Sequence, residues 1–411
     1  MMVAPKLRFK ADDGSDFSGW EEKTLGELCA PLTYGMNAAA TKFDGENRYI
    51  RITDIDDETH ALLPNDIVSP SGELDDKYLV KKGDILLART GASTGKSFLY
   101  HPKDSKLFYA GFLIKAHVLP SSDDYFIYSQ TLTDRYWKWV KTASMRSGQP
   151  GINANEYASY SFAVPSLPEQ RKIADFLSAV DAVIAAQQAE VDAWEQRKKG
   201  VMQKLFSQEV RFKADDGSDF PDWEEKTLGD LGEFIKGAPL SKADIAPEGN
   251  PMILYGELYT TYGEVAYEIA RSTNRNVDDK YRSKIGDVLI PTSGETPEEI
   301  STATCVMKEG VILAGDLYIY RTVDEIDGRI MSYLLNHQAN KAISCIAQGK
   351  SVVHVQAKEL RNVTVVFPLE MGEQRKIADC LSSMDEVIRK AKDELAKWQE
   401  LKKGLLQQMF V

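Results

Sequence analysis

A long internal repeat constrains this 411-residue chain more than any other feature. The segment EQRKIAD at Glu169–Asp175 recurs without change as Glu373–Asp379, about 204 residues further along. Nearer the start, RFKADDGSDF at Arg8–Phe17 recurs as Arg211–Phe220, and WEEKTLG follows each copy shortly afterwards. Solenoid repeats are roughly 20–50 residues long, so a period of about 200 residues indicates a duplicated domain. The chain is therefore expected to fold as two similar units.

Each unit ends in a run with the apolar spacing of a coiled-coil helix. Seam positions follow in alternating steps of four and three, which place their side chains on one stripe of a helix. Such a run would reach about 57 Å at 1.5 Å per residue, which is long for a helix packed only on its own domain core, the simpler alternative. Lys198 and Lys402 fall in this seam, where a polar residue fixes register and orientation. We expect the two helices to pack antiparallel through Ile173, Leu177, Val180, Ile184, Val191, Trp194, Val201, Leu205, Ile377, Leu381, Met384, Ile388, Leu395, Trp398, Leu405 and Met409.

The predicted fold class is α+β. Two mixed α/β domains, related by an approximate twofold axis, would be separated by the two long antiparallel helices. The RFKADDG segment follows the first helix directly, so its copy near the N-terminus should lie by the end of the second helix. The expected bounds are 1–167 and 209–371 for the mixed domains, and 168–208 and 372–411 for the helices.

Within each mixed domain, β-branched and aromatic runs bounded by Gly or Pro predict strands, and a longer segment predicts a helix. The strands expected in the first domain are 48–52, 84–88, 112–119 and 160–164, with a helix at 122–145. Those expected in the second are 251–255, 287–291, 317–321 and 363–367, with a helix at 327–346.

Charge and composition narrow the classes of function. A net charge of −12 argues against a nucleic-acid clamp along the whole chain, because phosphate affinity rests on Lys and Arg. No apolar run is long enough to cross a bilayer, and the first ten residues lack a signal-peptide core. The cysteines have no metal-type spacing, so we expect reduced thiols in a cytoplasmic protein without a metal site; they are Cys29, Cys305, Cys345 and Cys380.

The strongest enzyme-like motif fails on its spacing. In Thr90–Ser97 (TGASTGKS) three residues separate the two glycines, whereas a phosphate-binding loop needs four. The duplicate at Gly294–Glu298 has no Lys and carries acidic residues instead. No methyltransferase signature, glycine-rich cofactor loop or HExxH motif is present, so we predict no catalytic residues and no cofactor in this chain.

Paired segments in both units carry side chains that suit DNA. Lys and Arg neutralise phosphates, while Arg and Gln can make two hydrogen bonds to a base edge. Taken singly, the segments resemble ordinary amphipathic helices and turns, but their occurrence at equivalent places in both units favours a shared role. The predicted DNA-binding residues are Arg51, Thr53, Arg89, Thr90, Lys96, Lys138, Lys141, Arg146, Gln149, Tyr255, Thr292, Ser293, Lys341, Gln348 and Lys350.

With these features together, the chain resembles the specificity subunit of a type I restriction–modification system. The resemblance spans essentially the whole chain and rests on the order of its motifs. These are PEQRKIAD at Pro168–Asp175 with the copy of its EQRKIAD part at Glu373–Asp379, KKGDIL at Lys81–Leu86 with a weaker copy at Lys284–Leu289, Ser-Gly-Gln at Ser147–Gln149, and a long helix after each mixed domain. The second unit departs from the pattern, with Gln348-Gly349-Lys350 in place of Ser-Gly-Gln.

The resemblance implies two target-recognition domains, each reading one half of an asymmetric bipartite sequence in double-stranded DNA. It also implies two partner methyltransferase subunits that methylate adenine N6 with S-adenosylmethionine. Nuclease-translocase subunits, which use ATP and Mg, would join for cleavage. Three alternatives remain: a self-sufficient methyltransferase or NTPase, a structural adaptor that grips proteins, and the specificity subunit of a phage-defence system that only methylates.

Overall fold

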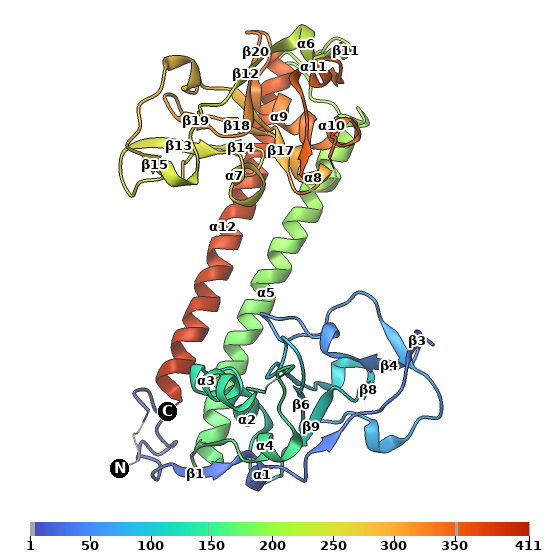
Figure 1. Cartoon of the computed structure of the whole chain (residues 1–411), viewed down its shortest axis with the longest axis vertical. Coiled ribbons are helices and arrows are strands. Elements are labelled where there is room, and N and C mark those ends of the chain that lie inside the picture. The colour runs from blue at the N-terminus through green and yellow to red at the C-terminus, as the bar shows by residue number, and fades with distance from the viewer. Residues whose placement is uncertain (1–4, 147, 350–351, 411) are drawn as a thin grey trace. The chain divides into compact units, whose positions relative to one another are not determined.

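The computed structural model describes residues 5–146, 148–349 and 352–410. The chain divides into two compact units (Figure 1): unit 1 is Met1–Ala189 with Lys392–Val411, and unit 2 is Glu190–Ala391. The division cuts both long helices, α5 (Leu167–Phe206) and α12 (Met371–Met409). Each unit therefore contains one mixed α/β domain and a piece of each helix.

The mixed domain of unit 1 is built on a four-stranded sheet in the order β2-β9-β6-β7. The central strand β6 is buried along its whole length and runs antiparallel to β9, with Asp84 opposite His117. Smaller sheets pair β4 with β8, β3 with β5, and β1 with β10. The strands are β1 (Glu21–Thr24), β2 (Thr33–Tyr34), β3 (Ala40–Lys42), β4 (Asn47–Ile50), β5 (Val68–Pro70), β6 (Asp84–Ala88), β7 (Ser97–Leu99), β8 (Lys106–Tyr109), β9 (Leu113–His117) and β10 (Ser161–Val164). The helices are α1 (Leu25–Leu28), α2 (Asp124–Gln130), α3 (Asp134–Ala143) and α4 (Ala154–Ala158).

The mixed domain of unit 2 follows the same plan with a larger sheet, in the order β12-β20-β16-β18-β14. A second sheet runs β15-β13-β19, and two further pairs join β17 with β21 and β11 with β22. The strands are β11 (Glu224–Thr227), β12 (Gly232–Lys236), β13 (Asn250–Leu254), β14 (Val265–Ala266), β15 (Arg271–Thr273), β16 (Asp287–Pro291), β17 (Ser293–Gly294), β18 (Thr304–Val306), β19 (Ile312–Ala314), β20 (Leu317–Thr322), β21 (Val353–His354) and β22 (Thr364–Phe367). The helices are α6 (Leu228–Leu231), α7 (Glu257–Thr260), α8 (Pro297–Ile300), α9 (Gly328–His337), α10 (Asn340–Ile346) and α11 (Ala357–Leu360). The α+β class predicted from the sequence is confirmed.

The helix predicted in each mixed domain is wrong in one respect, because each is two helices. In unit 1 the break falls between α2 and α3, where the hydroxyls of Thr131 and Thr133 donate to the carbonyls of Tyr128 and Gln130. Thr133 then caps α3 by accepting from the backbone N–H of Tyr136. Side chains that bond to their own backbone in this way compete with a continuous helix. In unit 2 the corresponding break separates α9 from α10 at Gln338 and Ala339.

Within each unit the two long helices run antiparallel. In unit 1, Ile173 and Leu177 of α5 share a core with Leu406 and Met409 of α12, and Lys402 pairs with Asp181 at 2.6 Å. In unit 2, Leu205 of α5 shares a core with Ile377 and Leu381 of α12, and Lys198 pairs with Asp385 at 2.5 Å. Every predicted seam residue is buried or half-buried. The lysines in the seam thus pair with an aspartate of the opposite helix in both units.

The repeated EQRKIAD motif is explained by its contacts with the repeated RFKADDG segment. Glu169 is fully buried and takes two hydrogen bonds from the Arg8 guanidinium, at 2.9 and 2.8 Å. In unit 2 the same pair is Glu373 with Arg211, at 3.0 and 2.8 Å. Two bonds in a fork hold the planar guanidinium in one orientation. The motif therefore anchors the segment that precedes each mixed domain to the start of a long helix.

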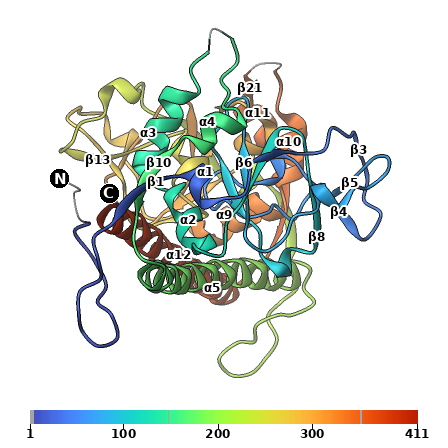
Figure 2. The same ribbon diagram turned by 90° about the horizontal axis from the view of Figure 1, so that it is seen from below.

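The N-terminal copy of this segment lies where the duplication predicts. The N–H of Leu7 donates to the carbonyl of Gln408 in α12 at 3.0 Å. At the equivalent place in unit 2, the N–H of Val210 donates to the carbonyl of Lys204 in α5 at 3.2 Å. Each copy continues into a hairpin, and in Figure 2 the hairpin of unit 1, in dark blue, projects from the rest of that unit. In each unit, the same segment therefore contacts the end of a long helix.

Candidate nucleic-acid interface

Five of the predicted DNA-binding residues of unit 1 line one cavity of about 760 Å³. They arrive from three loops: one after β4, one after β6 and one after α3. The fold ends β4 and β6 on the same side of the domain, which is why residues far apart in sequence meet there. The five are Arg51, Thr53, Arg89, Thr90 and Gln149.

The two arginines of this cavity are held differently. Arg89 lies with its guanidinium 4.8 Å from the centre of the Tyr34 ring, and its Nη1 is 3.4 Å from the carbonyl of Gly111. Arg51 instead forms ion pairs with Asp54 at 2.7 Å and with Asp66 at 2.9 Å. Its hydrogen bonds to Asp54 raise the pKa of Arg51 above its usual value. Arg89 has no carboxylate partner among the described residues and is the freer of the two to bind a ligand.

The loop after α3 reaches the end of β6 through backbone bonds. The N–H of Gly91 donates to the carbonyl of Pro150 at 3.0 Å, and Thr90 bridges to Gly151. Gly91 has φ +76°, a conformation that favours glycine, and a Cβ there would stand 3.2 Å from Nε2 of Gln149. Position 91 therefore favours glycine, both for its backbone conformation and for its close contact with the Gln149 side chain.

The remaining candidates of unit 1 lie apart from the cavity lining. Lys138 and Lys141 are exposed on α3. Arg146 is exposed but pairs with Glu156 at 2.5 Å. Lys96 is buried: its Nζ donates to the carbonyl of Ile55 at 2.8 Å and pairs with Asp57, so the fold does not bring it to this surface. Ser147, part of the Ser-Gly-Gln stretch, lies outside the described residues.

Unit 2 repeats the framework with other side chains. The N–H of Val355 donates to the carbonyl of Thr292 at 3.2 Å, just as that of Ile152 donates to the carbonyl of Arg89 at 2.9 Å in unit 1. Ser293 is buried and pairs with His354 between β17 and β21.

Four further candidates belong to unit 2, and the structure describes three of them. Gln348 bridges to His354 and donates to Glu359 at 3.3 Å. Tyr255 follows β13 and is half-buried. Lys341 is exposed on α10, and Lys350 lies outside the described residues.

Sequence reasoning missed one exposed residue in each unit, Phe112 before β9 in unit 1 and Asp316 before β20 in unit 2. Phe112 lines the cavity of unit 1 and is 63% exposed. Asp316 accepts a hydrogen bond from the Ser293 hydroxyl at 3.2 Å. Both lie in the part of the repeat that diverges, and neither is a cation, so neither residue type nor repetition distinguishes them in the sequence.

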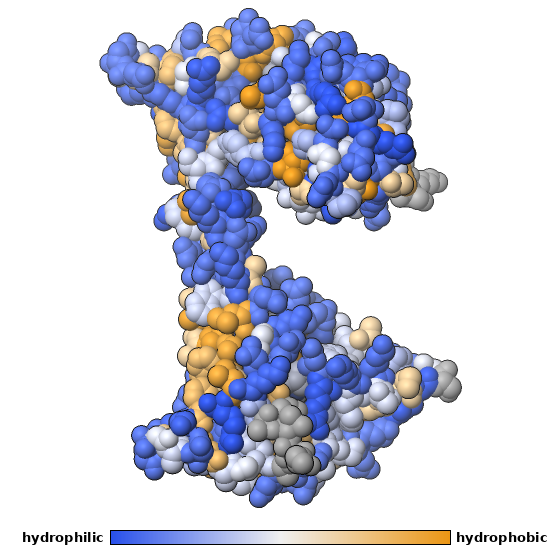
Figure 3. All heavy atoms as spheres, turned by 90° about the vertical axis from the view of Figure 1, so that its left-hand side faces the viewer, coloured by the Kyte–Doolittle hydropathy of each residue, from blue (hydrophilic) through white to orange (hydrophobic). Residues whose placement is uncertain are grey.

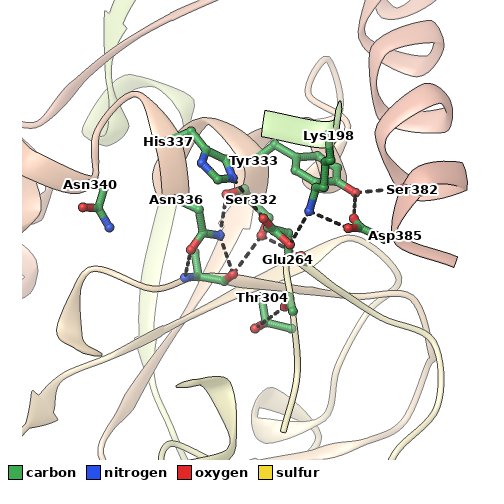
Figure 4. A network of polar contacts seen from close by, with 12 residues as sticks. Lys198, Glu264, Thr304, Ser332, Tyr333, Asn336, His337, Asn340, Ser382 and Asp385 are labelled. Atoms are coloured by element: carbon green, nitrogen blue, oxygen red, sulfur yellow. Dashed lines mark hydrogen bonds and ion pairs between the residues drawn. The ribbon is translucent and has the colours of Figure 1, made fainter. Parts of the chain in front are cut away.

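A partly buried polar network in unit 2 joins the long helices to the mixed domain (Figure 4). Lys198 of α5 pairs with Glu264 at 2.9 Å and with Asp385 of α12 at 2.5 Å. His337 bonds Glu264 at 2.9 Å, and the Tyr333 hydroxyl donates to Asp385 at 2.5 Å. In unit 1, Asp181 has the corresponding partners, Lys402 and the hydroxyl of Tyr125.

Charge compensation makes this network structural. Burial disfavours the charged form of Lys198, but its two carboxylates outweigh that effect and raise its pKa. Burial also opposes ionisation of Glu264, yet its bond to His337 and its attraction to Lys198 lower its pKa to about 2. The charged forms of Lys198 and Glu264 therefore stabilise each other, and their ion pair connects α5 to the mixed domain.

Two features are absent from the described residues. No group of three or more His, Cys, Asp or Glu side chains there is placed to hold a metal ion. None of the helices in the same part of the chain combines the length and the apolar character needed to cross a membrane.

Known proteins resemble this chain in sequence and in fold. A protein from Methanocaldococcus jannaschii, the putative type I restriction enzyme MjaX specificity subunit, is 26% identical over 410 residues, covering 94% of this chain and 92% of the relative. The MjaVIII specificity subunit from the same organism is 23% identical over 345 residues, 78% of this chain and 77% of the relative. The crystal structure of a type I restriction–modification S subunit from M. genitalium superposes with a TM-score of 0.64 at 17% identity, over 100% of this chain and 99% of that one, which shows a common fold.

The family model of the type I restriction modification DNA specificity domain matches the chain twice, over residues 18–193 and 221–397. The two matches correspond to the two copies of the repeat. The chain therefore belongs to the type I restriction–modification DNA specificity family and carries the family's domain twice.

Proposed function

We propose that this chain is the non-catalytic subunit that reads a bipartite, asymmetric sequence in double-stranded DNA, one half with each unit. The observation that carries the proposal is one backbone framework bearing different side chains in the two units. Arg89 of unit 1 occupies the position that Thr292 occupies in unit 2. Arg51 follows β4 in unit 1, and Tyr255 follows the corresponding strand, β13, in unit 2. Two copies of one scaffold with different side chains suit two different half-sites.

The repeated helices suit two copies of one partner. The clamps Arg8–Glu169 and Arg211–Glu373 give the start of each helix the same local structure. Figure 3 shows hydrophobic side chains gathered along the helices of unit 1. Among the helix residues of that unit, Phe176 is 37% and Leu401 is 48% exposed. Exposed apolar area of this kind is typical of protein–protein contact.

Two methyltransferase subunits that modify adenine N6 are the partners we propose, with nuclease-translocase subunits joining for cleavage. S-adenosylmethionine would be bound by the methyltransferase, and ATP with Mg by the nuclease. This chain would act in the cytoplasm, where those partners meet DNA.

Co-expression with the methyltransferase of its own system tests the proposal, in a host that lacks other N6-adenine methylation. Genome-wide mapping of methyladenine should reveal one split sequence in the presence of both proteins and none with either alone. Methylation by this chain alone would contradict the non-catalytic role. A stable complex that methylates without sequence preference would favour the adaptor role instead.

Phage challenge separates the two kinds of system to which such a subunit could belong. Addition of the nuclease-translocase subunit should reduce plating of an unmethylated phage if the system restricts. Equal plating with and without that subunit would indicate a system that only methylates.

A further inference from the structure

Phe112 and Asp316 occupy the same place in the two units. Each follows a glycine, Gly111 or Gly315, and precedes a strand of the main sheet. The backbone N–H of Arg89 donates to the carbonyl of Phe112 at 3.0 Å, and that of Thr292 donates to the carbonyl of Asp316 at 2.7 Å. The backbone thus presents these two side chains in an equivalent way.

The surroundings of the two side chains differ in chemistry. Phe112 shares the rim of its cavity with Arg89, so unit 1 offers an apolar ring beside a cation. Asp316 accepts a hydrogen bond from the Ser293 hydroxyl. Tyr255 lies beside Gly315, the residue before Asp316, because a Cβ built on Gly315 would be 3.1 Å from a ring carbon of Tyr255. Unit 2 therefore offers an exposed carboxylate where unit 1 offers a phenyl ring.

An exposed carboxylate on a DNA-reading surface restricts what can bind there. It accepts hydrogen bonds only, and phosphates repel it, so it suits a base edge rather than the sugar–phosphate backbone. In the major groove, cytosine presents an amino donor, guanine presents acceptors, and adenine places an acceptor next to its donor. Cytosine is the base that matches an isolated carboxylate. By the same rules, Arg89 suits guanine and a phenyl ring suits the methyl group of thymine.

We propose that Phe112 and Asp316 are specificity-determining residues at corresponding positions of the two half-sites. Asp316 accepts a hydrogen bond from the N4 amino group of a cytosine in the half-site of unit 2. Phe112 contacts the methyl group of a thymine that neighbours a guanine bound by Arg89 in the half-site of unit 1. This inference rests on the proposed function and adds the class of base that each unit selects.

Methylation mapping of variants in complex with the methyltransferase tests the inference. Asp316→Ala should lower the preference for cytosine at one position of one half-site by about tenfold or more, and leave the other half-site unchanged. Asp316→Asn should shift the preference at that position toward adenine, because an amide offers both a donor and an acceptor. Phe112→Ala should relax a thymine in the opposite half-site only.

Glu309→Ala is the matched control, because Glu309 is an exposed acid at the other end of β19 and should leave both half-sites unchanged. The inference is overturned if the Asp316 and Phe112 variants keep the wild-type preference at every position, or lose methylation evenly at all sites. A wild-type complex that still recognises a split sequence would then leave the proposed function intact. Absence of any sequence preference in the wild type would overturn both.

Discussion

At the scale of single residues, Lys198 shows how one buried cation keeps two half-buried acids compatible with folding. Its side chain is 10% exposed and lies between Glu264, 17% exposed, and Asp385, 30% exposed. Burial raises the pKa of Asp385, whereas Lys198 and His337 lower that of Glu264. A buried ion pair of this kind adds little to stability by itself, but removing one partner leaves the other charge without compensation.

Replacing Lys198 with Met should destabilise unit 2 by about 3–5 kcal/mol near neutral pH. Without the lysine, the folded-state pKa values of Glu264 and Asp385 rise above their unfolded values. The loss should therefore be largest at neutral pH and should shrink as the pH falls through those raised values, because protonation removes the repulsion. Hydrogen exchange of unit 2 measured at pH 7 and pH 5 checks this, with Lys199→Met as the exposed control. A loss that is equal at both pH values would point to lost packing instead.

Arg89 and Lys138 should differ in what they contribute to DNA recognition. Arg89 lies in the cavity lining, so Arg89→Ala should relax one base position of one half-site, at a cost of about 1–3 kcal/mol. Lys138 is exposed on α3, so Lys138→Ala should weaken binding to all sequences evenly. It should also lower by about one the slope of the logarithm of the binding constant against the logarithm of the salt concentration. Binding of the assembled complex to matched and mismatched duplexes at several salt concentrations separates the two effects. Sequence-independent weakening by Arg89→Ala would contradict its assignment.

At the scale of elements, each long helix is held by an ion pair at its start as well as by the seam between the two helices. The carboxylate of Glu169 is fully buried, and Arg8 comes from a segment about 160 residues away in sequence. Trp223 of unit 2 adds a hydrogen bond to the equivalent Glu373 at 3.1 Å. Each helix start is thus fixed by a residue that precedes the whole mixed domain.

Arg8→Ala should destabilise unit 1 by about 3–5 kcal/mol, because the charge of Glu169 would stay buried without its partner. Adding Glu169→Gln should recover part of the loss, since a neutral amide needs no counter-charge. Arg171→Ala, an exposed change in the same motif, is the control. Thermal unfolding followed by hydrogen exchange in unit 1 is the measurement. Equal stability of Arg8→Ala and the wild type would mean that the clamp is not needed.

The sequence predicts these elements unevenly, for physical reasons. The long helices are predicted well, because their seam repeats over many turns and the fully duplicated motifs mark where they start. The helix predicted at 122–145 breaks at Thr131–Thr133, because the hydroxyls of Thr131 and Thr133 bond to nearby backbone carbonyls and interrupt the helix. Strand β2 is two residues long, so its sequence shows too little alternation of apolar and polar residues to predict a strand without knowledge of β9, with which it pairs.

The candidate site shows the same limit. Its cations could be proposed from residue type and position in the repeat, but only the fold gathers Arg51, Arg89 and Gln149 around one cavity. Asp316 was missed because its importance comes from its equivalence to Phe112, which the backbone bonds reveal and the divergent sequence hides.

At the scale of the whole molecule, net charge limits how this chain meets DNA. A charge of −12 leaves only local surfaces, such as the exposed face of α3, to attract phosphates. The isolated chain should therefore bind DNA weakly and with strong salt dependence, and the methyltransferase partners should supply most phosphate contacts. Titration of labelled duplex at about 50 and 200 mM salt checks this. Tight binding by the chain alone that persists at the higher salt concentration would contradict it.

The division of α12 between the units has a consequence for biosynthesis. Unit 2 is one continuous stretch, Glu190–Ala391, whereas unit 1 is completed by residues that the ribosome adds only after all of unit 2. Leu406, Met409 and Phe410 fill the core beside Phe126 and Ile173, so that core stays open while unit 2 is being made. The domain translated first is thus completed after unit 2, and a nascent chain exposes its apolar face until the C-terminal part of α12 has been synthesised.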